Sequence, residues 1–141
     1  MSFDPKLFAK IGHSITRQGN FDKEARTRTA IGRAYYALFL SIRTEVRTLE
    51  GKAIHGREDQ IDHGALKNFL YLAKNTDLNN LARTLDELYE ARRQADYVLE
   101  PIGRWERYYE SPRNAKRLLM RAEAEIRRLP NIDFTEMVGK I

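Results

Sequence analysis

An arginine and a carboxylate interrupt an apolar stripe in the second half of the chain. Leu85, Leu88 and Tyr89 recur at helical spacing, and Arg92 continues the same stripe, with Asp96 one turn further on. Charged side chains on a core-facing stripe are costly unless they are paired or face a cleft or a partner chain. The pattern therefore predicts that these two charged residues are paired, or that they face a cleft or a partner chain.

A second arginine breaks the pattern of another apolar segment. Arg33 lies among the small residues Ala30, Ala34 and Ala37, which allow a second helix to approach closely. This placement predicts a buried or cleft-lining pair between Arg33 and Asp96. Two interpretations stay open: an ion pair that fixes the fold, and a cleft that receives an anionic ligand.

Another candidate site combines aromatic and basic side chains. In the stretch RWERYY, Arg104 and Arg107 flank Trp105, and such residues can stack on bases and contact phosphates. The alternative is that these rings close the open end of a helical bundle. Eight basic and four acidic residues lie between Gly103 and Arg128, so this region holds +4 of the net charge of +5. Such a surface suits a polyanion, or it is a solvated helix face with its own ion pairs.

Helices are expected to position all of these residues. Glycine and proline breaks separate five segments of helical periodicity, and no segment alternates like a strand. The sequence predicts an all-α fold, an antiparallel bundle of four to five helices. It also predicts one domain over residues 1–141, with a core of about 5–129 and a tail of 130–141. The expected helices cover about residues 5–18, 22–49, 62–73, 77–100 and 112–129.

Composition excludes several classes of protein. The chain has no cysteine, which excludes disulfides, a thiol nucleophile and cysteine-ligated metals. No apolar run approaches the roughly 18 residues of a membrane span, and the first residues lack a secretory signal, so a cytoplasmic protein is expected. Glycine-rich phosphate loops and the nucleophile elbow of hydrolases are absent. No cofactor is expected.

The histidines suggest two further candidate sites, for which the sequence gives little support. His55, Asp59 and His63 are spaced four apart, which would align three metal ligands on a helix. Gly56 and the absence of apolar residues argue against a helix there, so no metal site is predicted. Arg57 and His63 have five residues between them, a spacing that we interpret as chance.

Three short motifs follow one another along the chain: GRAYYALF at 32–39, DHGAL at 62–66 and RRQADY at 92–97. In order and spacing they resemble three motifs of the HEPN (higher eukaryote and prokaryote nucleotide-binding) domain family. These are R-x-YYA-x-F, the H-x-x-L that opens the third helix of the family, and the R-x-x-ADY that ends its fourth helix. The likeness covers about residues 5–128. It implies a dimerising helical bundle in a prokaryotic toxin–antitoxin or antiviral module, often beside a minimal nucleotidyltransferase.

The resemblance also implies a metal-independent ribonuclease, because many HEPN proteins cleave RNA with an R-x4-6-H motif. Both protomers contribute this motif to a cleft, where the cation holds the scissile phosphate and the imidazole moves the proton of the 2′-hydroxyl. Here Arg92 and Arg93 are present, but Asp96 and Tyr97 occupy the place of the expected histidine. A carboxylate close to arginines is a weak base. The sequence therefore leaves open whether the protein is an enzyme.

Two hypotheses for the function follow. In the first, a dimer binds RNA or nucleotides in an arginine-lined cleft, with or without cleavage. In the second, a non-catalytic module uses its dimer face and basic last helix to dock a partner such as a nucleotidyltransferase. For the first, the candidate catalytic residues are Arg92, Arg93 and Asp96, and the candidate binding residues are Arg33, Arg92, Arg93, Tyr97, Arg104, Trp105 and Arg107.

Overall fold

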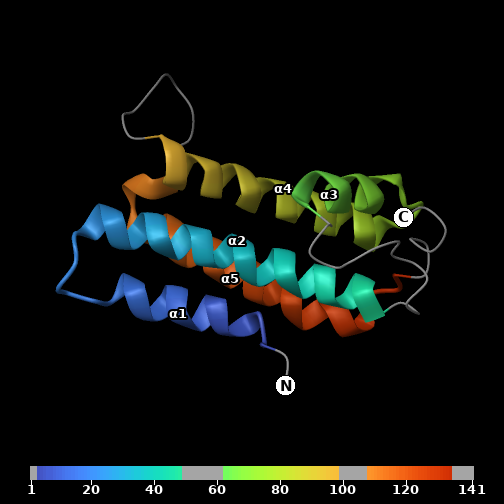
Figure 1. Cartoon of the computed structure of the whole chain (residues 1–141), viewed down its shortest axis with the longest axis horizontal. Coiled ribbons are helices and arrows are strands. Elements are labelled where there is room, and N and C mark those ends of the chain that lie inside the picture. The colour runs from blue at the N-terminus through green and yellow to red at the C-terminus, as the bar shows by residue number, and fades with distance from the viewer. Residues whose placement is uncertain (1–2, 49–61, 99–107, 135–141) are drawn as a thin grey trace.

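The fold is built from five α-helices (Figure 1). The computed structural model describes residues 3–48, 62–98 and 108–134, and no strand occurs in these three ranges. The predicted all-α fold is confirmed. No helix in these ranges is long and apolar enough to cross a membrane. The helices are α1 (Lys6–Thr16), α2 (Lys23–Thr48), α3 (His63–Leu72), α4 (Thr76–Tyr97) and α5 (Pro112–Arg128), with short 3₁₀ turns η2 (Tyr108–Glu110) and η3 (Leu129–Asn131).

Polar side chains determine where three of the helices begin. The free backbone amides of a first turn need acceptors, which short polar side chains supply. Asp62 accepts a hydrogen bond from the amide of Ala65 at 2.8 Å at the start of α3. Asn75 and Ser111 act in the same way at the starts of α4 and α5. Pro112 follows as the first residue of α5, where its missing amide hydrogen costs nothing.

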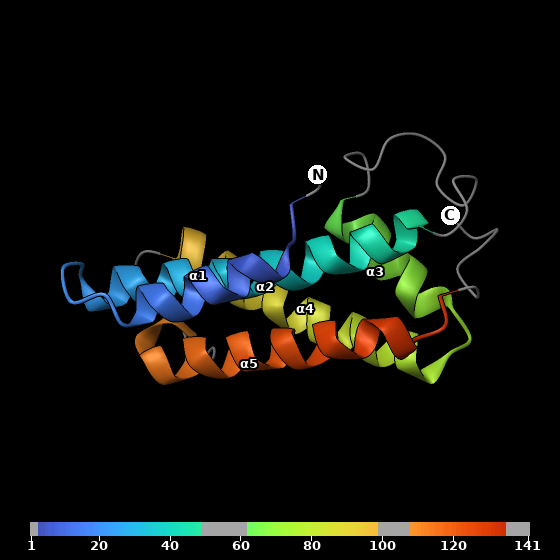
Figure 2. The same cartoon turned by 90° about the horizontal axis from the view of Figure 1, so that it is seen from below.

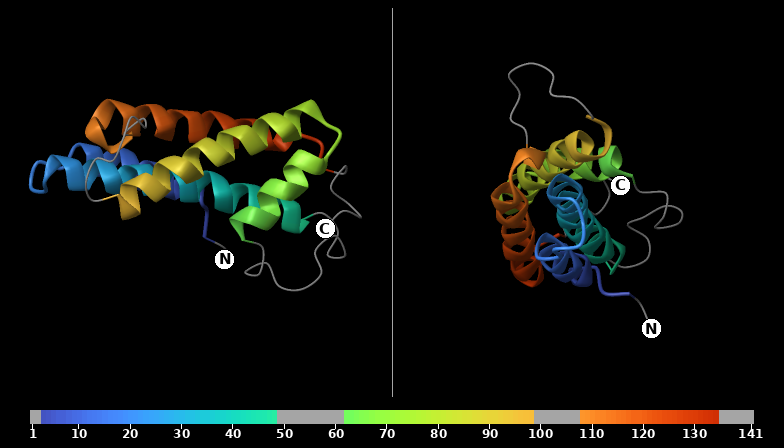
Figure 3. Two further views of the ribbon diagram at one scale, coloured as in Figure 1. Left: turned by 90° about the horizontal axis from the view of Figure 1, so that it is seen from above. Right: turned by 90° about the vertical axis from the view of Figure 1, so that its left-hand side faces the viewer.

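The longest helix, α2, is the centre of the bundle. It packs against α1, α4 and α5. Figure 1 shows that α2 and α5 run in one direction, while α1 and α4 run in the opposite direction. Short α3 lies along α4, and α1 lies at an outer corner of the bundle (Figures 2 and 3). The expected antiparallel bundle is therefore present, with α2 and α5 as its parallel pair.

Leucines and isoleucines of α2, α3, α4 and α5 fill the core. Burial of one such side chain stabilises the fold by about 1.5–3 kcal/mol. Their helical spacing is the apolar periodicity that predicted the helices. The largest fully buried side chains are Ile31, Leu38, Ile42, Leu66, Leu70, Leu78, Leu81, Leu85, Leu88, Leu118 and Leu119.

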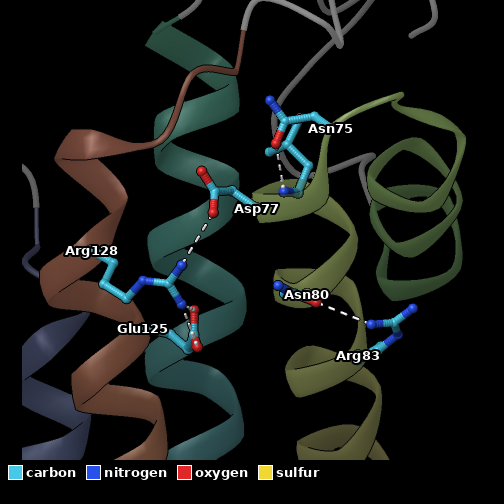
Figure 4. A network of polar contacts seen from close by, with 7 residues as sticks. Asn75, Asp77, Asn80, Arg83, Glu125 and Arg128 are labelled. Carbon is cyan, nitrogen blue, oxygen red and sulfur yellow. Dashed lines mark hydrogen bonds and ion pairs between the residues drawn. The ribbon is translucent and has the colours of Figure 1, made fainter.

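Two arginines tie the ends of α4 to other helices. At its start, Arg128 of α5 lies 3.4 Å from Asp77 and 3.1 Å from Glu125 (Figure 4). At its end, Arg28 of α2 donates a hydrogen bond to the carbonyl oxygen of Ala95 at 2.9 Å. The guanidinium of Arg28 also lies over the ring of Tyr109, 3.9 Å from its centroid. Positive charge at a helix C-terminus interacts favourably with the helix dipole, so Arg28 stabilises the end of α4.

Candidate functional site

Aromatic rings and arginines from four helices meet on one side of α2. We call this group the arginine–tyrosine cluster. Its members contact one another through ring–ring and cation–ring contacts, so the helices that carry them fix their positions together. The cluster consists of Phe8 of α1, Arg33, Tyr35 and Tyr36 of α2, His63 of α3, and Tyr89, Arg92 and Arg93 of α4.

Arg92 lies at the centre of the cluster. Its guanidinium carbon is 5.4 Å from the ring centroid of Tyr36 and 5.5 Å from that of Tyr35, within range of cation–π attraction. Its Nε lies 3.2 Å from the carboxylate of Asp96, one turn later on α4. Burial acts to lower the pKa of Arg92, but Tyr36 and Asp96 raise it, and the net pKa lies above the usual value. Arg92 therefore stays charged at every pH at which the protein folds.

Arg33 carries a charge that no nearby acid balances. Its guanidinium lies over the rings of Phe8 and Tyr36, at 5.2 and 5.7 Å from their centroids. Its Nε is buried and makes no hydrogen bond, and residues 3–48, 62–98 and 108–134 supply no ion-pair partner for it. A partly desolvated cation without a counter-charge is costly, so this position favours an incoming anion.

The predicted pair between Arg33 and Asp96 is wrong. Asp96 pairs with Arg92, and its side chain is 40% exposed. The physical reason is local: Asp96 follows Arg92 by four residues on the same helix, where side chains are neighbours. Arg33 instead packs on aromatic rings, which leaves its charge without a carboxylate.

Of the remaining predicted residues, the structure places only Arg93 beside the cluster. Arg93 is exposed and lies 5.9 Å from the ring centroid of Tyr89, so it flanks the cluster. Tyr97 is 69% exposed at the last turn of α4. The stretch that holds Arg104, Trp105 and Arg107 lies outside the described residues, and so does the interpretation that Trp105 closes the bundle.

The structure adds His63, which the sequence placed in the H-x-x-L motif but did not include among the candidate site residues. His63 begins α3, and its ring stacks on Tyr89 at 3.7 Å between centroids. Its Nδ1 lies 3.2 Å from the hydroxyl of Tyr35, and its Nε2 lies 3.7 Å from Asp86. Burial lowers the pKa of His63, while Asp86 raises it and Lys67 lowers it further, with a net lowering. The H-x-x-L motif was the signal that could have pointed to this residue.

This histidine supports the cluster and does not reach a ligand. Its side chain is only 11% exposed, and its Nε2 is buried without a hydrogen bond. The phenol of Tyr35 is also buried, and desolvation raises its pKa above the usual value, so it stays protonated. His63 and Tyr35 therefore hold the aromatic layer on which Arg92 rests. The side chains of the cluster that are not fully buried are arginines and aromatic residues.

The part of the chain that the structure describes contains no set of metal ligands. No three histidine, aspartate or glutamate side chains gather there closely enough to hold an ion. Two members of the weak metal alternative, His55 and Asp59, lie outside the described residues. An anion is therefore the kind of ligand for which the cluster offers partners.

Comparisons with known proteins give one distant relative. No family model matches the chain, and no solved structure matches it. It is similar to an uncharacterized protein of Methanocaldococcus jannaschii, MJ0992, with 28% identity over 110 residues. The similarity covers 70% of this chain and 62% of that protein, so the chain spans less than two thirds of this relative. This similarity assigns neither a family nor an activity.

Proposed function

We propose that this chain is a HEPN-like helical protein of a prokaryotic toxin–antitoxin or defence module that binds RNA or nucleotides. Arg33 and Arg92 would hold the phosphate, and Arg93 would flank it. One observation carries the proposal: Arg33 and Arg92 both contact the ring of Tyr36, and Arg33 has no carboxylate partner among the described residues. Guanidinium groups bind phosphate oxygens with paired, charge-assisted hydrogen bonds.

The rings of the cluster extend the proposal from phosphate to nucleotide. Tyr36 and Phe8 are only partly buried, and aromatic faces of this kind stack on unpaired bases. In a cytoplasmic homodimer, as the HEPN resemblance implies, two such clusters would share one cleft. That arrangement would double the positive charge offered to one RNA strand.

Cleavage is a further step that this proposal leaves to experiment. Metal-independent cleavage needs a group that takes the 2′-hydroxyl proton, and a cation at the phosphate. Arg92 and Arg93 supply the cation, while Asp96 is the nearest carboxylate, held 3.2 Å from Arg92. RNA should be incubated in EDTA with wild type and with Arg92→Ala/Arg93→Ala. Cleavage that is lost in the variant would make the protein a ribonuclease, and no cleavage by either protein would limit it to binding.

A second candidate function rests on α5. Its outer face forms a shallow groove lined by Arg113, Lys116, Arg117, Met120 and Arg121, and Met120 is 56% exposed. An exposed apolar side chain among cations is typical of a surface that docks an acidic protein. The alternative is therefore a non-catalytic module that docks a nucleotidyltransferase antitoxin or another protein there.

An equilibrium binding assay distinguishes the two functions. The probe is a fluorescein-labelled single-stranded RNA, and the variants are Arg33→Gln/Arg92→Gln and the matched control Arg83→Gln/Arg113→Gln. The control removes two exposed arginines that lie outside the cluster. The proposal predicts that the cluster variant weakens RNA binding about tenfold or more, because each charge-assisted phosphate contact contributes roughly 1.5–3 kcal/mol. Equal affinity of both variants and wild type would contradict RNA binding at the cluster.

A further inference from the structure

The outward face of α1 is apolar although it faces solvent. Leu7 and Ile11 lie four residues apart on α1 and are 40% and 45% exposed, and Phe3, which precedes the helix, is 56% exposed. The opposite face of the helix, with Ala9 and Gly12, is buried against the bundle. Figure 3 shows α1 at an outer corner of the bundle. A continuous row of large apolar side chains on a surface helix marks a contact with another molecule.

The apolar row leads into a cavity at the junction of α1 and α2. This cavity has a volume of about 200 Å³ and is lined mainly by apolar atoms. Ile15 continues the row of α1, and Phe21, which is 66% exposed, forms part of the rim. A cavity at the end of an apolar row can receive an anchoring side chain, which a flat surface cannot.

Positive charge runs along one side of the row. Helical periodicity places Lys6, Lys10 and Arg17 on a common flank of α1. Lys6 lies 3.9 Å from Asp4, but Lys10 and Arg17 have no ion-pair partner within the described ranges. Another nearby acid, Asp22, accepts a hydrogen bond from a backbone amide in the first turn of α2. The flank therefore carries unbalanced positive charge beside an apolar strip.

We propose that this α1 surface, formed by Phe3, Leu7, Ile11 and the cavity at Phe21, docks an acidic amphipathic helix of a partner protein. The apolar side of the partner would cover the row and insert one side chain into the cavity. Its carboxylates would face Lys10 and Arg17. From Leu7 to Ile15 the row on α1 is about 12 Å long, at roughly 1.5 Å per residue, and Phe3 extends the surface beyond the start of the helix. A partner helix of about three turns would cover it. Phe3 touches the ring of Phe8, a member of the arginine–tyrosine cluster, but Leu7, Ile11 and the cavity share no residue with the cluster.

Charge decides between this partner and a second copy of the chain. A second α1 would bring its own Lys10 and Arg17 to the contact and only one acidic residue, Asp4, which already pairs with Lys6. An acidic helix supplies the missing negative charge. The cavity distinguishes this partner from an anionic lipid surface, because lipid headgroups offer no anchoring side chain.

Fluorescence anisotropy with designed peptides tests the proposal. The probe is a labelled peptide of about 18 residues of Glu, Ala and Leu, with its leucines on one helical stripe, long enough to cover the surface. The comparison peptide has the same composition with the stripe scrambled. Wild type is expected to bind the striped peptide at least about tenfold more tightly than the scrambled one. Binding should weaken about tenfold or more in Leu7→Ser/Ile11→Ser, and also in Lys10→Glu/Arg17→Glu.

Two control variants make the result specific. Tyr71→Ser/Leu72→Ser removes two exposed apolar side chains on α3 and should bind the striped peptide like wild type. Arg33→Gln/Arg92→Gln should also bind normally, so failure here is distinguishable from failure of RNA binding. Because Leu7 and Ile11 are exposed, the Ser variants should keep the far-UV circular dichroism and melting temperature of wild type.

Three results would overturn the proposal. The first is equal binding of the striped and scrambled peptides, or no binding of either. The second is co-sedimentation with phosphatidylserine vesicles that Leu7→Ser/Ile11→Ser abolishes while peptide binding is absent, which would indicate a lipid surface. The third is a wild-type dimer in sedimentation velocity that the same variant converts to a monomer, which would assign the face to a second copy.

Discussion

At the scale of single residues, Arg33 and Arg92 show how one ring can hold two cations. Both guanidinium groups lie near Tyr36, but Asp96 balances only the charge of Arg92. Asp96 follows Arg92 by four residues on α4 and therefore pairs with Arg92, so its carboxylate does not pair with Arg33. The unbalanced charge of Arg33 is therefore a consequence of sequence spacing, and it is the feature that most favours an anionic ligand.

Loss of the Asp96 carboxylate should have little effect on stability. Its side chain is 40% exposed and pairs with Arg92 at a spacing of four residues, and such pairs stabilise helices by about 0.3–0.5 kcal/mol. We expect Asp96→Ala to lower the free energy of unfolding by no more than this amount in a urea titration. A loss of about 3 kcal/mol or more, the usual cost of breaking a buried pair, would contradict the exposed pair seen here.

His63 should make stability depend on pH. Burial lowers its pKa in the folded protein below the usual value of about 6.5, so folding favours the neutral imidazole. The unfolded chain then binds more protons, and stability is complete above about pH 6.5 and falls as the pH drops below that value. Asp86 and Asp62 oppose this lowering, and Lys67 adds to it.

Urea unfolding of wild type and His63→Gln at pH 7.5 and 5.0 measures this effect. Wild type should lose more stability than the variant between the two pH values, because glutamine does not titrate. Both proteins share every other titratable group, so the difference between their losses belongs to His63. Equal losses would show that the histidine titrates alike in the folded and unfolded chains.

At the scale of elements, close approach of α1 to α5 depends on one glycine. A Cβ added at Gly12 would lie 2.6 Å from Cδ2 of Leu119 and 3.3 Å from Cβ of Arg33. Leu119 is fully buried in the core. Gly32, in the interior of α2, has no heavy atom within 4 Å of an added Cβ. The two glycines therefore form a matched pair for a test of packing.

We expect the two alanine substitutions to change stability in opposite directions. Alanine at either position gains about 0.5–1 kcal/mol from helix propensity. For Gly12→Ala, overpacking against Leu119 costs about 1–3 kcal/mol and outweighs this gain. Thermal melts should therefore show a lower Tm for Gly12→Ala and a higher Tm for Gly32→Ala. A higher Tm for both would mean that α1 and α5 separate easily.

Much of the element scale could be predicted from the sequence. Apolar periodicity, with the glycine and proline breaks between segments, located the five helices because both signals are local. Periodicity identifies the inner face of each helix but not which residues of two helices meet. The stack of His63 on Tyr89 is such a meeting, and so is the contact of Arg33 with Phe8. For that reason the sequence identified Arg33, Arg92 and Asp96 as charged residues that interrupt apolar patterns. It did not identify the residues that they contact.

At the scale of the whole molecule, the described helices present three different surfaces. The arginine–tyrosine cluster lies on one side of α2, the apolar row lies on α1, and the basic groove lies on the outer face of α5. Separate surfaces allow separate partners, because no residue of the cluster lines the groove of α5. The proposed RNA binding and the proposed protein docking can therefore be tested independently of one another.

The salt dependence of RNA binding tests the proposed phosphate site most directly. For single strands, the slope of log K against log salt concentration changes by about 0.7 for each phosphate contact that is lost. We predict a slope for Arg33→Gln/Arg92→Gln that is shallower than that of wild type by about 1.4 per protomer engaged, with an unchanged slope for Arg83→Gln/Arg113→Gln. Parallel lines for wild type and the cluster variant would contradict a phosphate site at Arg33 and Arg92.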